Sequence, residues 1–297
     1  MPSWRWRSPQ QGASLTTHQA APSAGAGQAP EPAAFHGRSD TGDVRRHNED
    51  SLLIDAALGL AAVADGMGGH WSGEIASAGA LATLHASLSD TSAPHASTQD
   101  ETEADPDATT VNQRWRHAAA VMRAITAANA SLYAANQAHG HADGAGMGST
   151  LTGVLLLPSL RSLISFHVGD SRLYRYRAGT LELLTRDQTA YQAALESGAP
   201  GALPPQNLLL QAVGPAPAVT PDVALHDCHA GDLLLLCSDG LHGWVPHAEL
   251  ARSLAEPDVP LEQACARLIA LAKQHHSRDN ITALLVRIQF PSPRVSV

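Results

Sequence analysis

The sequence is poor in cysteine and in long apolar runs, and each shortage excludes a class of protein. Its three cysteines, Cys228, Cys237 and Cys265, are too few and too irregularly spaced for a disulfide framework or a thiolate zinc site. No uncharged apolar stretch approaches the length of a membrane span, and no apolar signal segment follows the cationic first residues. We therefore expect a cytoplasmic protein with reduced cysteines and no membrane partner.

Positive charge is also scarce, and several familiar motifs are missing. The 19 Lys and Arg against 28 Asp and Glu give a net charge of -9, which argues against binding a nucleic-acid backbone. No GxxxxGK[ST] or GxGxxG loop is present, so nucleotide binding through such loops is not supported. Ser149 and Ser171 lie outside any GxSxG elbow, so neither is indicated as a nucleophile.

The apolar content favours one folded domain with two polar segments. Hydrophobic residues make up 44% of the chain and charged residues 16%, which is enough apolar material for a substantial core. Residues 1–34 are rich in Ala, Pro, Gly, Ser and Gln without a hydrophobic period, which predicts a disordered tail. Residues 89–112, rich in Pro, Ser, Thr and acids, predict an acidic surface loop within a domain over residues 35–290.

Short apolar segments alternate with amphipathic ones. Buried strands are predicted at residues 51–54, 60–64, 151–157, 163–168, 233–237 and 282–288. Helical spacing of apolar residues predicts helices at residues 73–88, 115–138 and 261–273. Few strands are linked through a single helix, and residues 163–184 read as consecutive strands. The pattern favours an α+β fold of mostly antiparallel sheets with helices outside.

Three aspartates adjoin predicted strands. Asp65 follows LAAVA, Asp239 follows LLLLCS, and Asp279 precedes NITALLV. A carboxylate beside a strand end is rigidly placed, and several that converge repel one another unless cations neutralise them. Hard oxygen ligands indicate Mg²⁺ or Mn²⁺. The alternative is plain turn chemistry, because Asp65 and Asp239 are each followed by glycine.

Six segments that occur in one order resemble a known family. They are NED (48–50), ADGMGGH (64–70), MGSTLTG (147–153), VGDSRLY (168–174), CSDGLHGWV (237–245) and RDNIT (278–282). Together they resemble the bacterial metal-dependent protein phosphatases, the PPM or type 2C family. The resemblance extends from about Gly37 to Ile288.

The resemblance implies a four-layer αββα sandwich of two antiparallel sheets, with a metal site at one end. Two core Mn²⁺ or Mg²⁺ ions would supply a bridging hydroxide that attacks phosphoserine or phosphothreonine in line. By position, Asp65 would bridge the two ions and the carbonyl of Gly66 would bind one of them. Asp239 and Asp279 would complete the other.

Further acids would extend this site. Glu49 and Asp50 match positions that hold metal-bound waters, so both would act through water. Asp170, in the GDSR segment, would help to bind a third, weaker ion. Its alternative interpretation is a turn acid that caps a hairpin.

Two cationic residues complete the implied chemistry. Arg45 would bind the phosphoryl oxygens, because a guanidinium offers bidentate geometry. His70 would be the general acid that protonates the leaving alkoxide. The neighbouring Arg46 is interpreted as a solvated charge, and His242 as structural.

The chain departs from the family pattern at two places. Asp187 to Thr189 read AspGlnThr where AspHisSer or AspHisThr is common, and Gln211 stands where an Arg is usual. Both places border the flap segment, residues 189–212, beside the active site. Substrate choice is therefore harder to predict than chemistry.

The implied partners are phosphorylated Ser/Thr proteins, including a bacterial Ser/Thr kinase or its substrates, and we expect a monomer. One alternative is a non-catalytic module of the same fold that binds phosphoproteins, against which the intact Asp65, Asp239 and Asp279 argue. Another is a phosphodiesterase or small-molecule phosphatase, which only substrate tests would separate.

Overall fold

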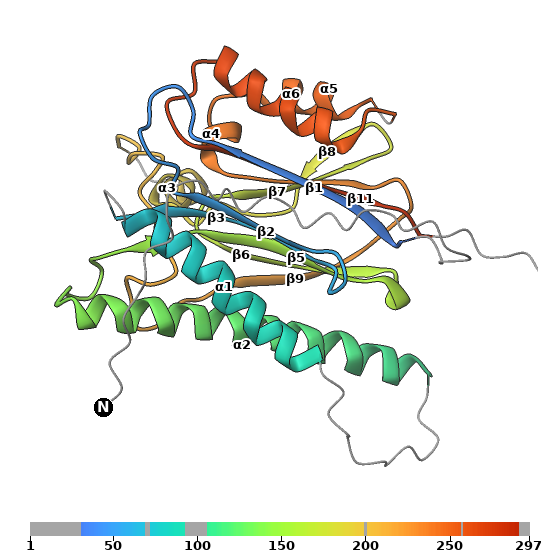
Figure 1. Ribbon diagram of the computed structural model, residues 1–297, viewed down its shortest axis with the longest axis horizontal. Helices are drawn as coiled ribbons and strands as arrows, with labels where there is room; N and C mark the ends of the chain where they lie inside the picture. Colours follow the sequence, from blue (N-terminus) through green and yellow to red (C-terminus); the bar gives the residue numbers. More distant parts are fainter. Residues whose placement is uncertain (1–30, 69–71, 93–105, 199–200, 257, 291–297) are drawn as a thin grey trace, which may run out of the picture. The chain divides into compact units, whose positions relative to one another are not determined.

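Strands of the chain form two sheets that pack face to face, with helices on both outer faces (Figure 1). The structure, a computed structural model, describes residues 31–68, 72–92, 106–198, 201–256 and 258–290. The arrangement confirms the predicted α+β sandwich of four layers.

Every pairing within the two sheets is antiparallel. The first sheet has the order β1 (Ala33–Asp40), β11 (Ile281–Ile288), β10 (Leu233–Cys237), β7 (Arg172–Arg177) and β8 (Thr180–Leu183). The second has the order β2 (Asp50–Asp55), β3 (Leu60–Met67), β5 (Leu151–Leu157), β6 (Ser162–Val168) and β9 (Asp222–Asp227), with β4 (Gly148–Ser149) paired to β3.

Two strands differ from the sequence prediction. β1 was not predicted as a strand, and it begins at Ala33, two positions before the predicted domain boundary at residue 35. Its pairing with β11 orders these residues despite their low hydrophobicity. Residues 1–30 of the predicted tail lie outside the described part of the chain. β9 was not predicted, because most of its residues are exposed at a sheet edge and form no apolar run.

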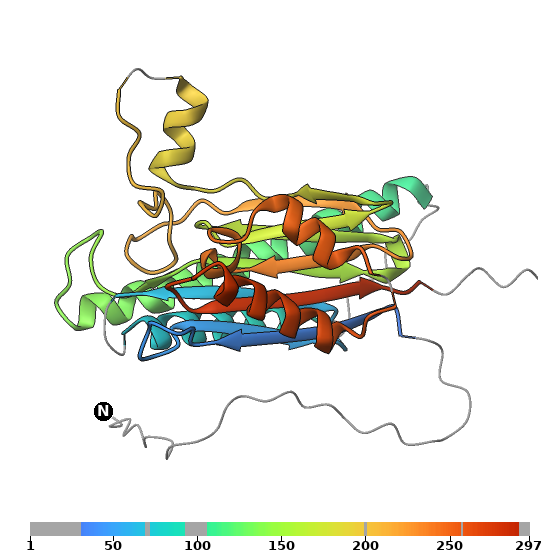
Figure 2. The same ribbon diagram turned by 90° about the horizontal axis from the view of Figure 1, so that it is seen from above.

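Helices form the two outer layers. α1 (Ser72–Ser92) and α2 (Pro106–Ala138) cover the second sheet, whereas α4 (Asp239–His242), α5 (His247–Leu254) and α6 (Leu261–Gln274) lie over the first (Figure 1). A short 3₁₀ turn, η1 (Pro158–Leu160), links β5 to β6. Figure 2 shows α3 (Ala190–Ser197) beyond the ends of the strands. None of the helices described here combines the length and apolarity needed to cross a membrane.

The connection between α1 and α2 is shorter than the predicted loop over residues 89–112. α1 continues to Ser92, and α2 begins at Pro106. Proline is favoured at the first position of a helix, where its missing N–H costs no hydrogen bond. Residues 93–105 lie outside the described part of the chain.

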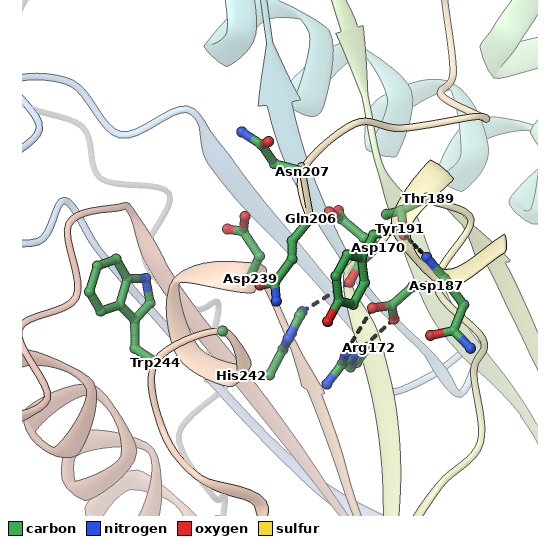
Figure 3. Close-up of a pocket in the computed structure, with 12 residues that line it drawn as sticks. Asp170, Arg172, Asp187, Thr189, Tyr191, Gln206, Asn207, Asp239, His242 and Trp244 are labelled. Carbon is green, nitrogen blue, oxygen red and sulfur yellow. Dashed lines mark hydrogen bonds and ion pairs between the residues drawn. The ribbon is translucent and has the colours of Figure 1, made fainter. Parts of the chain in front are cut away.

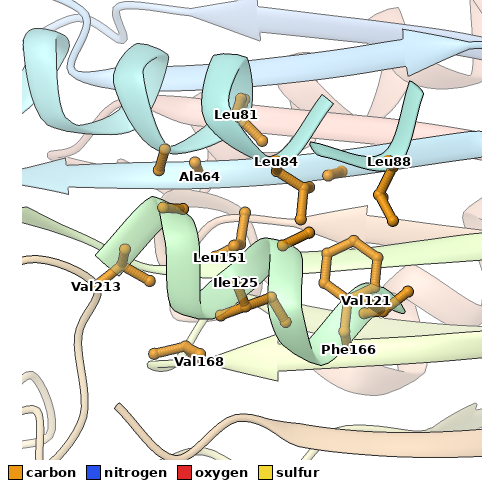
Figure 4. Packing of buried hydrophobic residues seen from close by; sticks show 14 of the residues in the cluster. Ala64, Leu81, Leu84, Leu88, Val121, Ile125, Leu151, Phe166, Val168 and Val213 are labelled. Carbon is orange, nitrogen blue, oxygen red and sulfur yellow. The ribbon is translucent and has the colours of Figure 1, made fainter. Parts of the chain in front are cut away.

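Alternation along the strands separates three apolar layers. On β3, Leu60, Ala62 and Ala64 face α1 and α2, a layer that Figure 4 shows with Leu84 and Phe166. The intervening residues of β3 lie in the core between the two sheets. Asp65 lies two positions after Val63 and therefore on the same face of β3, so its carboxylate points toward the first sheet.

The packing of Phe166 on Gly153 gives a test of the helix-facing layer. The two residues are paired across β5 and β6, and a Cβ added at Gly153 would lie 2.2 Å from Phe166 Cζ. We expect Gly153→Ala to lower the free energy of unfolding by about 1–3 kcal/mol, since overpacking forces a buried ring to shift. Urea unfolding measures the loss. The double variant with Phe166→Leu should lose less than the sum of the single losses, and strict additivity would contradict this contact.

Candidate functional site

The core between the sheets becomes polar at one end, around Asp50. Asp50 lies opposite Asp65 in the pairing of β2 with β3. The hydroxyls of Ser238 and Thr282, at the ends of β10 and β11, each donate to Asp50 Oδ2 at 2.7 Å. Neither hydroxyl was predicted from the sequence, although each lies two positions along the chain from an inward-facing core residue and is polar. These two hydrogen bonds connect the first sheet to the Asp50 carboxylate of the second sheet.

Five carboxyl groups converge beside these hydroxyls. Burial, and then the charges of Asp50, Asp239, Asp170 and Asp279, raise the pKa of Asp65 well above its ordinary value. Burial and the charge of Asp279 raise the pKa of Asp239 to about 6. Such a cluster of like charges is costly when ionised, and divalent cations would relieve the repulsion.

Two carboxyl oxygens of the cluster are candidates for binding a cation. Asp50 Oδ1 and Asp239 Oδ1 are buried and receive no hydrogen bond from any described residue. A buried, unpaired carboxylate oxygen fits a hard cation. In the described ranges, no three Asp, Glu, His or Cys side chains group closely enough to hold an ion by themselves. An ion at this cluster would therefore take further ligands from main-chain carbonyls and water, as Mg²⁺ commonly does.

The main chain around Asp65 is held on two sides. Its N–H donates to Thr150 Oγ1 at 2.9 Å, and its carbonyl accepts from the Thr150 N–H at 2.8 Å. The next residue, Gly66, has no space for a side chain, because an added Cβ would lie 2.0 Å from the carbonyl oxygen of Gly73. The Glu49 carboxyl group also lies against Gly73. The structure thus brings Gly66 and Glu49 together at the start of α1.

Asp170 lies on a tight turn after β6. Gly169 has a φ of +102°, which an L side chain rarely adopts, and the Asp170 side chain is buried. Burial, followed by the charges of Asp239 and Asp187, raises the pKa of Asp170 to about 7. His242 Nε2 donates to the Asp170 carbonyl at 2.9 Å. Burial lowers the pKa of His242 to about 3, so the ring is neutral.

Arg45 contacts the cluster from the solvent side. Its Nη2 donates to Asp279 Oδ2 at 2.7 Å, and its side chain is 49% exposed. Asn280 supports this region, since its Oδ1 accepts from the Glu49 N–H and its Nδ2 donates to the His47 carbonyl. No role was predicted for Asn280 from the sequence, although the residue lies in the RDNIT segment.

The structure gathers most of the predicted site residues at one end of the two sheets. They are Arg45, Glu49, Asp50, Asp65, Gly66, Asp170, Asp239 and Asp279. His70, the predicted general acid, lies outside the described residues.

A pocket of about 410 Å³ adjoins the cluster (Figure 3). Asp170 and Asp239 contribute to its wall, and the flap segment contributes Tyr191 and Gln206. Trp244, after α4, lines it from the other side. A group bound in this pocket would therefore contact both the carboxyl cluster and the flap segment.

Known proteins resemble this chain over most of its length. The model of the family described as "Protein phosphatase 2C" matches residues 43–286. The Mycobacterium tuberculosis "Serine/threonine protein phosphatase PstP" is 34% identical over 259 residues, which are 86% of this chain and 45% of that protein. This chain thus spans about half the length of that relative.

Two further comparisons cover nearly the whole of the other chain. The Listeria welshimeri "Serine/threonine phosphatase stp" is 32% identical over 257 residues, 84% of this chain and 93% of that protein. The crystal structure of the PstP catalytic domain in complex with two manganese ions has a TM-score of 0.67 and 32% identity, and covers 86% of this chain and 98% of that one. With the family model matching most of the sequence, the chain belongs to the protein phosphatase 2C family.

Proposed function

We propose that this protein is a metal-dependent phosphatase of phosphoserine and phosphothreonine in proteins. The observation that carries the proposal is the convergence of five aspartates at one end of the sandwich, with Arg45 beside them. The names of the relatives, which are serine/threonine phosphatases, support the same activity.

The residues that would hold Mn²⁺ or Mg²⁺ follow from this arrangement. Asp65 and Gly66 belong to the end of β3, whereas Asp239, the first residue of α4, and Asp279, just before β11, face them from the side of the first sheet. Asp50 and Glu49 would act through water, and Asp170 would serve a third, weaker ion. When bound, the ions lower the pKa of water to near neutrality and offset the charge of the phosphoryl oxygens.

The side chains around the cluster bind the substrate and move its proton. Arg45 is half exposed, so its guanidinium can leave Asp279 and donate to the phosphoryl oxygens. His70 would donate a proton to the departing serine or threonine oxygen, which is a poor leaving group as an alkoxide. The pocket beside Asp170 would take the residues that flank the phosphorylated side chain.

The wider setting follows from the same proposal. The substrates would include a bacterial Ser/Thr kinase or the proteins that it phosphorylates, and the enzyme would act as a monomer. Its proposed location is the cytoplasm, where thiols stay reduced, and the three buried cysteines are free.

The first test compares wild type with Asp239→Asn. Wild type should release phosphate from a phosphothreonine peptide with Mn²⁺, and excess chelator should stop the release. Asp239→Asn should abolish release because a metal ligand is lost. The same change should raise the free energy of unfolding of the metal-free protein by about 3 kcal/mol at pH 7.5, since a carboxyl with a raised pKa destabilises the native state.

The stability gain of Asp239→Asn has a defined pH dependence. The native carboxyl has a pKa of about 6 against an ordinary 3.8, so the native state binds more protons between these values. Stability of the wild type therefore falls as pH rises through this window, and the gain should shrink toward pH 4. Asp258→Asn, on the exposed turn between α5 and α6, is the control. Wild-type turnover in Asp239→Asn would contradict the metal assignment.

Arg45→Lys tests phosphate binding. An ammonium keeps the charge but loses the bidentate geometry, so kcat/KM for the phosphopeptide should fall about tenfold, the equivalent of one charge-assisted hydrogen bond. Steady-state kinetics at saturating Mn²⁺ measures the change. Arg46→Lys should leave the kinetics unchanged, and a larger loss in Arg46→Lys than in Arg45→Lys would reverse the assignment.

His70→Ala tests proton donation to the leaving group. Turnover of a phosphothreonine peptide should fall by about 10²–10⁴-fold, the usual contribution of a general acid. An aryl phosphate should lose far less, because a phenolate needs little protonation to depart. His139→Ala, at the exposed end of α2, is the control. Equal losses on both substrates would exclude His70 as the general acid.

A further inference from the structure

The Asp170 turn is joined to the start of the flap segment by Gln188. The Gln188 N–H donates to the Gly169 carbonyl at 2.7 Å. In return, the Gly169 N–H donates to Gln188 Oε1 at 3.0 Å. Gln188 is only 7% exposed, so both bonds are shielded from water. The residue before Asp170 is therefore held through both of its main-chain polar groups.

The remaining polar groups of Gln188 bind two other segments. Its Nε2 donates to Asp222 Oδ2 at 3.0 Å and, at 3.5 Å, to the Thr220 carbonyl, both at the start of β9. Its carbonyl accepts from the Leu210 N–H at 2.8 Å, where the chain returns from the flap. One residue thus joins the Asp170 turn, both ends of the flap and the second sheet.

Gln188 stands behind the wall of the pocket. Its neighbours Asp187 and Thr189 line the pocket beside Asp170 (Figure 3), whereas the Gln188 side chain is directed to Gly169 and Asp222. Its neighbour Asp187 is held separately, because Arg172 donates to both carboxyl oxygens at 2.8 and 2.7 Å. Gln188 is not among the described residues that line the pocket, so it would act through the residues that it holds.

We propose that Gln188 is a positioning residue that holds the Asp170 carboxylate and the flap segment at fixed positions relative to each other. This inference rests on the proposed function, in which Asp170 serves a third ion and the flap borders the phosphoprotein. A glutamine amide donates and accepts at once in every ionisation state, so it can hold Gly169 and Asp222 together. Loss of the amide would leave the Gly169 N–H buried without its acceptor.

Gln188→Leu tests the proposal, because it keeps similar bulk but removes the amide. Calorimetric titration of the full chain with Mn²⁺ identifies the Asp170 site as the one that is lost in Asp170→Asn. In Gln188→Leu, Mn²⁺ should bind at that site about tenfold more weakly, a change in binding free energy that corresponds to one unsatisfied buried polar group. KM for the phosphopeptide should also rise, while kcat for a small aryl phosphate at saturating Mn²⁺ should stay near the wild-type value.

Gln211→Leu is the matched control. Gln211 also lies at the base of the flap, and its Oε1 accepts from the Thr220 N–H at 3.2 Å, but this contact is exposed and does not involve Gly169. Its Mn²⁺ titration should match wild type. Gln188→His, measured at pH 8, should restore binding, since a neutral imidazole carries one donor and one acceptor.

Several results would overturn the proposal. They are a Gln188→Leu titration that matches wild type, an equal change in Gln211→Leu, and a loss of kcat without any change in Mn²⁺ binding or KM. If Gln188→Leu does not fold, Gln188→Asn takes its place, because the shorter amide cannot reach both Gly169 and Asp222. Absence of phosphate release from wild type would contradict the proposed function instead, and the titrations would still decide the role of Gln188.

Discussion

Electrostatic repulsion among buried carboxyl groups is the constraint around which this molecule is organised. Five aspartates meet where the core between the sheets ends, and burial strengthens their mutual effect. Only a rigid framework holds like charges so close together. The framework comes from strands whose apolar residues lock both sheets, and from Ser238 and Thr282, which bind Asp50 across the gap between them.

The side chains of the carboxyl cluster and the arginine beside it are not held equally firmly by their surroundings. Asp65 lies near the end of β3 and is held by hydrogen bonds of its own main chain to Thr150, and Asp170 follows Gly169, whose main chain is bound by Gln188. Arg45 is half exposed and makes one contact with Asp279 at the solvent side. This division suits a site in which the carboxylates stay fixed while the phosphate-binding cation adjusts to its substrate.

Much of this arrangement could be predicted from local sequence. β5 and β10 are rich in apolar residues and buried throughout, and both begin and end where the sequence predicted. Asp65, Asp239 and Asp279 were identified because each adjoins a predicted strand, whereas Asp50 and Asp170 were identified only from the family resemblance. β9 was missed since its residues are mostly exposed and do not form an apolar run. Partnerships such as that of Asp50 with Thr282, 232 positions apart, depend on strand pairing that no local pattern reveals.

The alternation along β3 has a consequence for how such a chain can diverge. Asp65 faces the carboxyl cluster only because it is an even number of positions from Ala61 and Val63, which lie in the core between the sheets. A single inserted or deleted residue within β3 would turn the carboxylate toward the helices. Changes of length that preserve the carboxyl cluster would therefore have to fall in the connections between strands, and the flap segment is one such connection.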